Sequence, residues 1–156
     1  MTAKIVPSLW FVADAAAAAA FYVSLFPGSA VERVTTSPVK TPDGHPVELV
    51  DFTLAGQPFI AMAAGPLDPF NHAISFTVNC ADQAEIDRLW EALQEGGSIE
   101  QCGWLKDRYG VSWQIVPAVF ASMIGAPDRA AALRATQAML GMVKLDIAEL
   151  QRAFDG

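Results

Sequence analysis

The sequence predicts an α+β protein of two βαβββ modules, whose sheets are curved and open, followed by a helical C-terminal tail. The main observation is an internal repeat. Residues 7–14 read as an apolar strand followed by an acidic helix cap, and residues 73–82 read the same way. A helix is predicted after each, and each helix ends near a Gly-Ser step, at Gly28 and at Gly97. The steps are 69 residues apart (97 − 28), a spacing that indicates a duplicated structural unit.

The first module is predicted over about residues 4–64. A β-branched and aromatic strand over residues 5–12 precedes a helix that Asp14 caps and that reaches about residue 26. Strands are expected at residues 30–37, 47–54 and 58–64, with a Pro-rich loop over residues 38–46 and a tight hairpin turn at residues 55–57.

The second module is predicted over residues 72–117. Its first strand covers residues 72–78, and a helix follows in which Asp82 and Glu85 have the spacing of a capping box. Residues 98–105 read as a strand, residues 107–110 as a turn in which Lys106 and Asp107 could pair at the surface, and residues 111–117 as the last strand. Residues 118–156 break the repeat and form a helical extension, which we expect to pack on the outer helical layer or on a second subunit. The whole chain is expected to be one globular unit.

Composition excludes several classes of function. The net charge is −7 and no block of Lys and Arg occurs, so nucleic acid is not an expected partner. No apolar run is long enough to span a bilayer, and no export signal precedes the first strand, so we expect no membrane partner and a cytoplasmic location. Two cysteines form no disulfide framework. The hydrophobic share of 53% predicts a buried or partner-facing surface, and we expect a homodimer.

Several motifs make the chain resemble a known group. The paired βαβββ pattern is similar to the glyoxalase/bleomycin-resistance/dioxygenase group, the vicinal oxygen chelate superfamily. A more specific resemblance is to its PhnB-like branch, whose members are often described as demethylubiquinone methyltransferases. It covers roughly residues 4–155 and rests on Leu9-Trp10-Phe11, Ala19-Ala20-Phe21-Tyr22, Leu25-Phe26-Pro27-Gly28-Ser29, Cys102-Gly103-Trp104-Leu105-Lys106-Asp107 and Tyr109-Gly110-Val111-Ser112-Trp113-Gln114.

The resemblance also implies where a metal would be held. Metal-using members of the superfamily take one His, Gln or Glu from each of four strands. Those positions fall here at about Pro7, near Ala61 or Met62, at Ala73 and at Gln114. Of these residues only Gln114 offers an oxygen ligand and none offers an imidazole nitrogen, so we predict no metal and no other cofactor. His72 is one residue from the third position. A one-residue shift in strand register would bring it there, but it would also turn the other side chains of the strand to the opposite face of the sheet.

The remaining candidates are a thiol and an apolar pocket. Cys102 is a weak candidate nucleophile, because a free cysteine is more often a small buried apolar residue than an activated thiolate. Apolar walls with a few polar groups are typical of a small-molecule pocket. The residues predicted to line it are Ser8, Trp10, Met62, His72, Cys102, Trp104, Trp113 and Gln114. We therefore expect a metal-free protein that binds a small molecule. The alternative is a metal-dependent or Cys-dependent lyase, isomerase or dioxygenase of the same superfamily.

Overall fold

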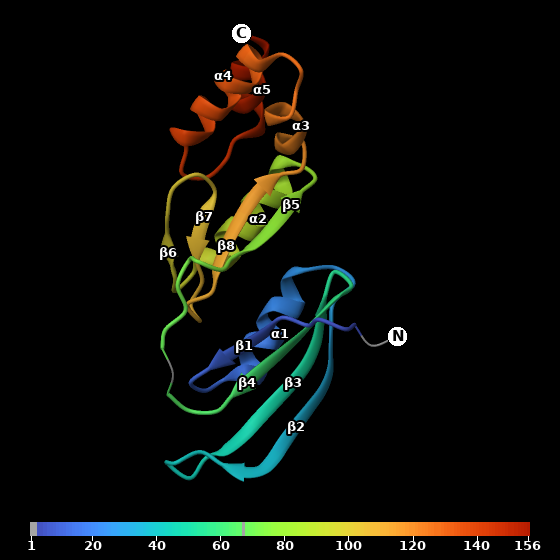
Figure 1. Ribbon diagram of the computed structural model, residues 1–156, viewed down its shortest axis with the longest axis vertical. Helices are drawn as coiled ribbons and strands as arrows, with labels where there is room; N and C mark the ends of the chain where they lie inside the picture. The colour runs from blue at the N-terminus through green and yellow to red at the C-terminus, as the bar shows by residue number, and fades with distance from the viewer. Residues whose placement is uncertain (1–2, 67) are drawn as a thin grey trace. The chain divides into compact units, whose positions relative to one another are not determined.

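The computed structural model describes residues 3–66 and 68–156, which form two compact units, one ending at Asp68 and the other covering Pro69–Gly156 (Figure 1). The first unit contains β1 (Ser8–Phe11), α1 (Ala15–Leu25), β2 (Ala30–Lys40), β3 (Pro46–Leu54) and β4 (Gln57–Ala63). The second contains β5 (Phe76–Cys80), α2 (Gln83–Gln94), β6 (Ser98–Ile99), β7 (Trp104–Lys106) and β8 (Ser112–Pro117), and then α3 (Phe120–Ile124), α4 (Arg129–Leu140) and α5 (Ile147–Asp155).

The two sheets have the same topology, which confirms the predicted fold class. Their strand orders are β1-β4-β3-β2 and β5-β8-β7-β6. In each sheet the first strand pairs in parallel with the last, and the other pairs are antiparallel. The repeat in the sequence is therefore a repeat of structure.

In each unit a helix packs against one face of the sheet. In the first unit, Leu9, Phe11 and Phe52 are buried on the α1 side, whereas Ser8 and Trp10 alternate with them and are exposed. In the second unit, Leu105, Trp113 and Ile115 are buried on the side of α2. Each sheet therefore has a helix-covered face and an open face, and side chains on the open faces are available for function.

Several predicted strand boundaries were wrong. The strand predicted to end at Ser37 continues to Lys40, because β2 is an edge strand and tolerates Pro38 at a register irregularity. The strand predicted from residue 72 begins at Phe76, because Asn71 Oδ1 accepts the amide of Ala73 and holds this segment in a turn. β1 is shorter at both ends than the predicted residues 5–12.

The strand predicted over residues 98–105 is in fact two strands. β6 and β7 are separated by a turn in which Cys102 and Gly103 both have positive φ angles, of 59° and 81°. The amide of Trp104 donates to the carbonyl oxygen of Gln101 to close this turn. A left-handed conformation is rare for cysteine, so local pattern alone could not indicate the break.

The predicted helix caps differ in outcome. Asp82 Oδ1 accepts the amide of Glu85 at 2.9 Å, and Glu85 Oε2 accepts the amide of Ala81, so the capping interaction on α2 is confirmed. Asp14 precedes α1 but makes no side-chain cap, since its backbone is left-handed with φ 62°. Within the described residues, no helix has the length and apolar character needed to cross a membrane.

The C-terminal extension belongs to the second unit. It has its own buried apolar cluster, formed by Phe120, Met123, Ala135, Met142, Leu145 and Leu150. Gln83 and Asp87 of α2 hold it in place. Gln83 Nε2 donates to the carbonyl oxygen of Leu145 at 3.1 Å, and Lys144 Nζ lies 2.5 Å from Asp87 Oδ1. The hydrogen bond from Lys144 is the largest of the interactions that lower the pKa of the Asp87 carboxyl.

Candidate ligand-binding faces

Three polar and aromatic side chains form a row across the open face of the second sheet. Thr77 on β5 pairs in register with Gln114 on β8, and Gln114 pairs with Trp104 on β7. Residues that pair in register project from the same face of a sheet. Gln114 and Trp104 are each half-buried, so this face combines an aromatic surface with an amide.

A cavity of about 290 Å³ lies along this row. It is lined by Thr77, Cys102, Trp104, Gln114, Val116, Phe120, Ala121, Ile124, Met139, Leu140 and Leu145. Three of the eight predicted pocket residues, Cys102, Trp104 and Gln114, come together here. None of the lining side chains carries a charge, which favours an uncharged occupant because burying an unpaired charge is costly.

Gln114 is the polar group that the sheet positions best. Its Nε2 donates to Ser75 Oγ at 2.9 Å, which fixes the orientation of the amide. Its Oε1 accepts no hydrogen bond from any described residue. The amide therefore offers an acceptor at the cavity wall to a ligand that carries an O–H or N–H group.

Cys102 lies in the turn between β6 and β7 rather than on a strand. Its amide donates to the carbonyl oxygen of Met142 at 2.8 Å, and its Sγ lies 3.9 Å from the carbonyl oxygen of Leu140. The neighbouring amide of Gly103 donates to Val143 at 2.7 Å. These contacts tie the turn to the C-terminal extension. The other thiol, Cys80, is buried, and desolvation raises its pKa to about 12, which makes it unreactive near neutral pH.

His72 lies beside this face, not in the strand. Its side chain is exposed and its ring meets that of Trp104 edge-on, with centroids 6.4 Å apart. Its Nδ1 is 3.9 Å from Glu100 Oε1, which is a long contact for an ion pair and an exposed one.

Trp113 lies on the opposite face of the sheet from Gln114. It is 2% exposed on the α2 side, and its Nε1 donates to Asp107 Oδ2 at 2.8 Å. Asp107 Oδ1 also accepts the amides of Tyr109 and Val111. Asp107 is thus a buried structural residue rather than half of a surface pair, a role that the sequence analysis missed because charged residues next to a turn are usually exposed.

The open face of the first sheet carries the other predicted residues. Ser8 pairs with Ile60, and Trp10 pairs with Met62. Trp10 is 36% exposed, and its Nε1 donates to the carbonyl oxygen of Gly65 at 3.2 Å. These residues do not come together with Cys102, Trp104 and Gln114 within either unit.

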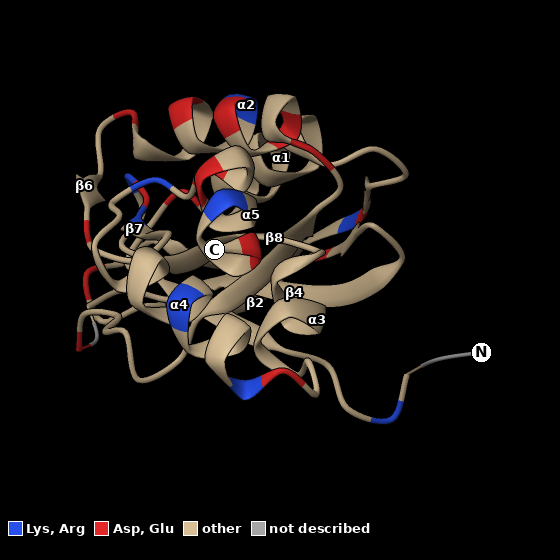
Figure 2. Cartoon of the chain, turned by 90° about the horizontal axis from the view of Figure 1, so that it is seen from above, with Lys and Arg blue, Asp and Glu red and all other residues tan. Residues whose placement is uncertain are grey.

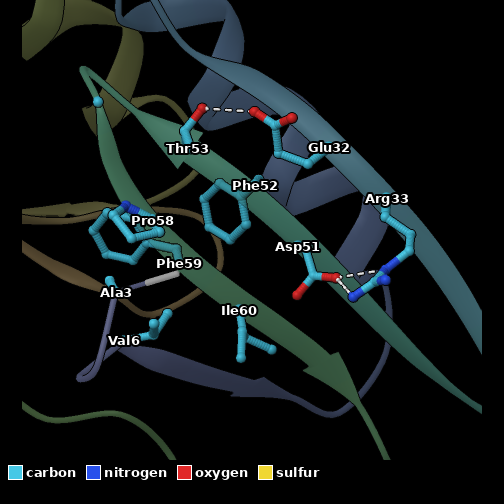
Figure 3. A pocket seen from close by; sticks show the side chains of 11 residues that line it. Ala3, Val6, Glu32, Arg33, Asp51, Phe52, Thr53, Pro58, Phe59 and Ile60 are labelled. Carbon is cyan, nitrogen blue, oxygen red and sulfur yellow. Dashed lines mark hydrogen bonds and ion pairs between the residues drawn. The ribbon is translucent and has the colours of Figure 1, made fainter. Parts of the chain in front are cut away.

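A wider cavity of about 770 Å³ lies at one end of the first sheet (Figure 3). Pro58 and Ile60 line it, and Arg33 and Asp51 point toward each other along its side, with Nη2 and Oδ2 2.6 Å apart (Figure 3). Arg33 is largely exposed, so this pair contributes little and each charge neutralises the other. None of the eight predicted pocket residues lines this cavity.

The four positions that correspond to the metal ligands of the metal-using relatives lie in different surroundings in this chain. Met62 and Gln114 are on open faces, Ala61 is fully buried, and Ala73 is exposed in the turn before β5. Pro7 precedes β1 and is half-buried. Among residues 3–66 and 68–156, no three His, Cys, Asp or Glu side chains form a group able to hold a metal ion. The donor set thus does not fit the metal centre of those relatives.

Two βαβββ units with one open face each define a protein of the glyoxalase-like fold. Residues 3–116 match the family model described as 3-demethylubiquinone-9 3-methyltransferase. The chain belongs to this PhnB-like family, which is consistent with the vicinal oxygen chelate superfamily. The match ends before the C-terminal extension.

Solved structures agree with the family match. The putative 3-demethylubiquinone-9 3-methyltransferase, PhnB protein, from Bacillus cereus is 32% identical, with a TM-score of 0.68, and the match covers 74% of this chain and 100% of that one. Protein PA1353 from Pseudomonas aeruginosa is 25% identical, with a TM-score of 0.60, over 72% of this chain and 95% of that one. Among curated proteins, none matches significantly.

Proposed function

We propose that this chain is a metal-free small-molecule binding protein of the glyoxalase/bleomycin-resistance type, and that the open face of its second sheet holds an uncharged, mainly aromatic ligand. The observation that carries this proposal is the cavity that gathers Trp104, Gln114 and Cys102. Its volume of about 290 Å³ is close to the lower end of ligand pockets, roughly 300 Å³. An apolar lining with a few convergent polar groups is the usual composition of such a site.

The donor chemistry supports a site that works without a metal. Proline, alanine and methionine provide neither the oxygen nor the imidazole ligands that hold a divalent ion in metal-using relatives. Gln114 provides an amide oxygen, and its amide nitrogen is engaged by Ser75. We therefore assign Gln114 to hydrogen bonding with the ligand rather than to metal coordination.

The name of the family suggests methyl transfer, but the architecture favours binding. Doubly wound folds bind dinucleotide-like cofactors where a Gly-rich turn follows a parallel strand. Neither described sheet has that topology, since each contains one parallel pair and two antiparallel pairs. The sequence also has no block of Lys and Arg, and on α2, α4 and α5 Figure 2 shows short blue segments separated by red or tan ones, which does not favour a nucleic-acid partner.

One specific observation favours the alternative that the protein is a Cys-dependent enzyme: Cys102 lines the cavity. A nucleophilic thiol needs a neighbouring base, cation or helix N-terminus. Among the described residues, the hydrogen-bond contact of its Sγ is with the carbonyl oxygen of Leu140, which cannot take a proton from it at neutral pH. A Cys102 thiol that iodoacetamide alkylates faster than a model thiol near neutral pH would favour the enzyme.

The binding proposal is tested by calorimetric titration with 2-naphthol, an uncharged aromatic probe with one O–H group. We expect saturable binding that EDTA does not change. Trp104→Ala should weaken it by about tenfold, because the ring contact is lost. The matched control is Trp10→Ala, which removes a half-exposed tryptophan from the first sheet and should leave the affinity within about twofold. Absence of binding, or equal losses in both variants, contradicts the proposal.

A further inference from the structure

The cavity of the second unit depends on a part of the chain outside the family match. That match ends at residue 116, and six of the eleven residues lining the cavity come from the extension that follows. They are Phe120, Ala121, Ile124, Met139, Leu140 and Leu145. The sheet therefore supplies the aromatic and polar side of the cavity, and the extension supplies an apolar wall facing it.

The C-terminal part of this wall is held in a defined position by contacts on either side of Leu145. Next to the cavity, the amides of Cys102 and Gly103 donate to the carbonyl oxygens of Met142 and Val143. Farther along, Gln83 Oε1 accepts the amide of Ile147 at 2.9 Å. Leu145 lies between these anchors and is 1% exposed. A wall tied down on either side of a buried residue is preorganised, so ordering it costs little when a ligand binds.

Size and charge limit what this cavity can take. The cavity is partly open to solvent, and its volume of about 290 Å³ is enough to hold one or two fused rings, since an enclosed apolar cavity of about 150 Å³ already holds one benzene molecule. No charged side chain lines it, so a charged ligand would lose its hydration without compensation. The unpartnered Oε1 of Gln114 favours a ligand with a hydrogen-bond donor.

We propose that the C-terminal extension is the selective wall of the binding site, and that it restricts the ligand to an uncharged molecule of one or two fused rings with an O–H or N–H donor. This inference rests on the proposed function and adds a role for residues 118–156. In a protein without such an extension, the corresponding end of the sheet would be open, and ligands would not be selected by size.

The test compares three probes by calorimetry: phenol, 2-naphthol and the anion 2-naphthoate. The variant Ile124→Trp enlarges a side chain that lines the cavity and is already 41% exposed, so the fold should tolerate it. It should weaken 2-naphthol by about tenfold and phenol by less than about threefold, because only the larger probe fills the cavity. Wild-type protein should bind 2-naphthoate at least about tenfold more weakly than 2-naphthol.

The matched control is Leu133→Trp, the same enlargement in the extension at a residue that is 57% exposed and does not line the cavity. This variant should change neither the affinity for 2-naphthol nor the affinity for phenol. If Trp104→Ala weakens 2-naphthol but Ile124→Trp does not, the extension is no wall, and this inference fails while the proposed function stands. If no probe binds the wild-type protein, the proposed function fails and this inference with it. Equal affinity for 2-naphthoate overturns the restriction to uncharged ligands.

Discussion

At the scale of single residues, two glycines that the repeat makes equivalent have different roles. Gly28 has φ 72° and open space where a Cβ would be, so it serves the left-handed turn after α1. After α2 the left-handed residue is Gly96, with φ 75°. Gly97 is instead a site of close approach, because a Cβ there would lie 2.0 Å from the carbonyl oxygen of Lys106.

We therefore predict that Gly97→Ala destabilises the second unit by about 3 kcal/mol, since backbone rather than a flexible side chain blocks the added methyl group. The measurement is urea unfolding followed by circular dichroism. The matched control is Gly141→Ala, where φ is −86° and the nearest atom to a Cβ is 3.4 Å away, so the expected change is within about 0.5 kcal/mol. Similar urea midpoints for the two variants would contradict this prediction, because they would show that the backbone near Lys106 moves to admit the methyl group without loss of stability.

Residue-level patterns predicted the capping of α2 but not the cap-free start of α1. Asp82 and Glu85 form the predicted bonds, whereas Asp14 is left-handed and makes none. The difference lies in backbone conformation, which the residue type alone does not determine. The break at Cys102 was missed for the same reason.

At the scale of elements, the extension is attached to α2 by the side chain of Gln83. Its Nε2 donates to the carbonyl oxygen of Leu145 and its Oε1 accepts from the amide of Ile147, so one side-chain amide bonds a backbone group just before α5 and one at its first residue. Nothing local in the sequence predicts this contact, because the partners are 62 and 64 residues away. The sequence predicted that the extension is helical, but the packing partner of its helices depends on such long-range contacts.

We predict that Gln83→Ala lowers the free energy of unfolding of the second unit by about 1–3 kcal/mol, because both backbone groups lose their partner. Hydrogen exchange at the amide of Ile147 should become faster than in the wild-type protein. Gln94→Ala, at the other end of the same helix, removes an amide that makes no side-chain hydrogen bond among the described residues and serves as control. Equal exchange at Ile147 in both variants would contradict a role for Gln83 in attaching the extension.

At the scale of the whole molecule, the sequence predicted the architecture well and the site incompletely. The period of the apolar pattern and the acidic helix caps are local signals. They were sufficient to predict two units, and the structure shows that the two units have matching strand order. The alternation of strand residues placed Gln114 on the open face. The apolar wall opposite it could not be predicted, since it comes from a segment whose position is determined by tertiary contacts alone.

The apolar surface of the chain leads to the last prediction. Among the described residues, large apolar side chains are exposed on both units, including Trp10, Val34 and Leu133. Exposed apolar side chains that gather into one contiguous patch are typical of proteins that associate, and we take these residues as candidates for such a patch. We propose that the chain forms a homodimer, so that light scattering after size-exclusion chromatography gives about twice the 16.7 kDa of one chain. Because association stabilises the folded state by mass action, the thermal midpoint should rise with protein concentration. A mass of one chain together with a concentration-independent midpoint would mean that these side chains remain in water or are covered within the chain itself.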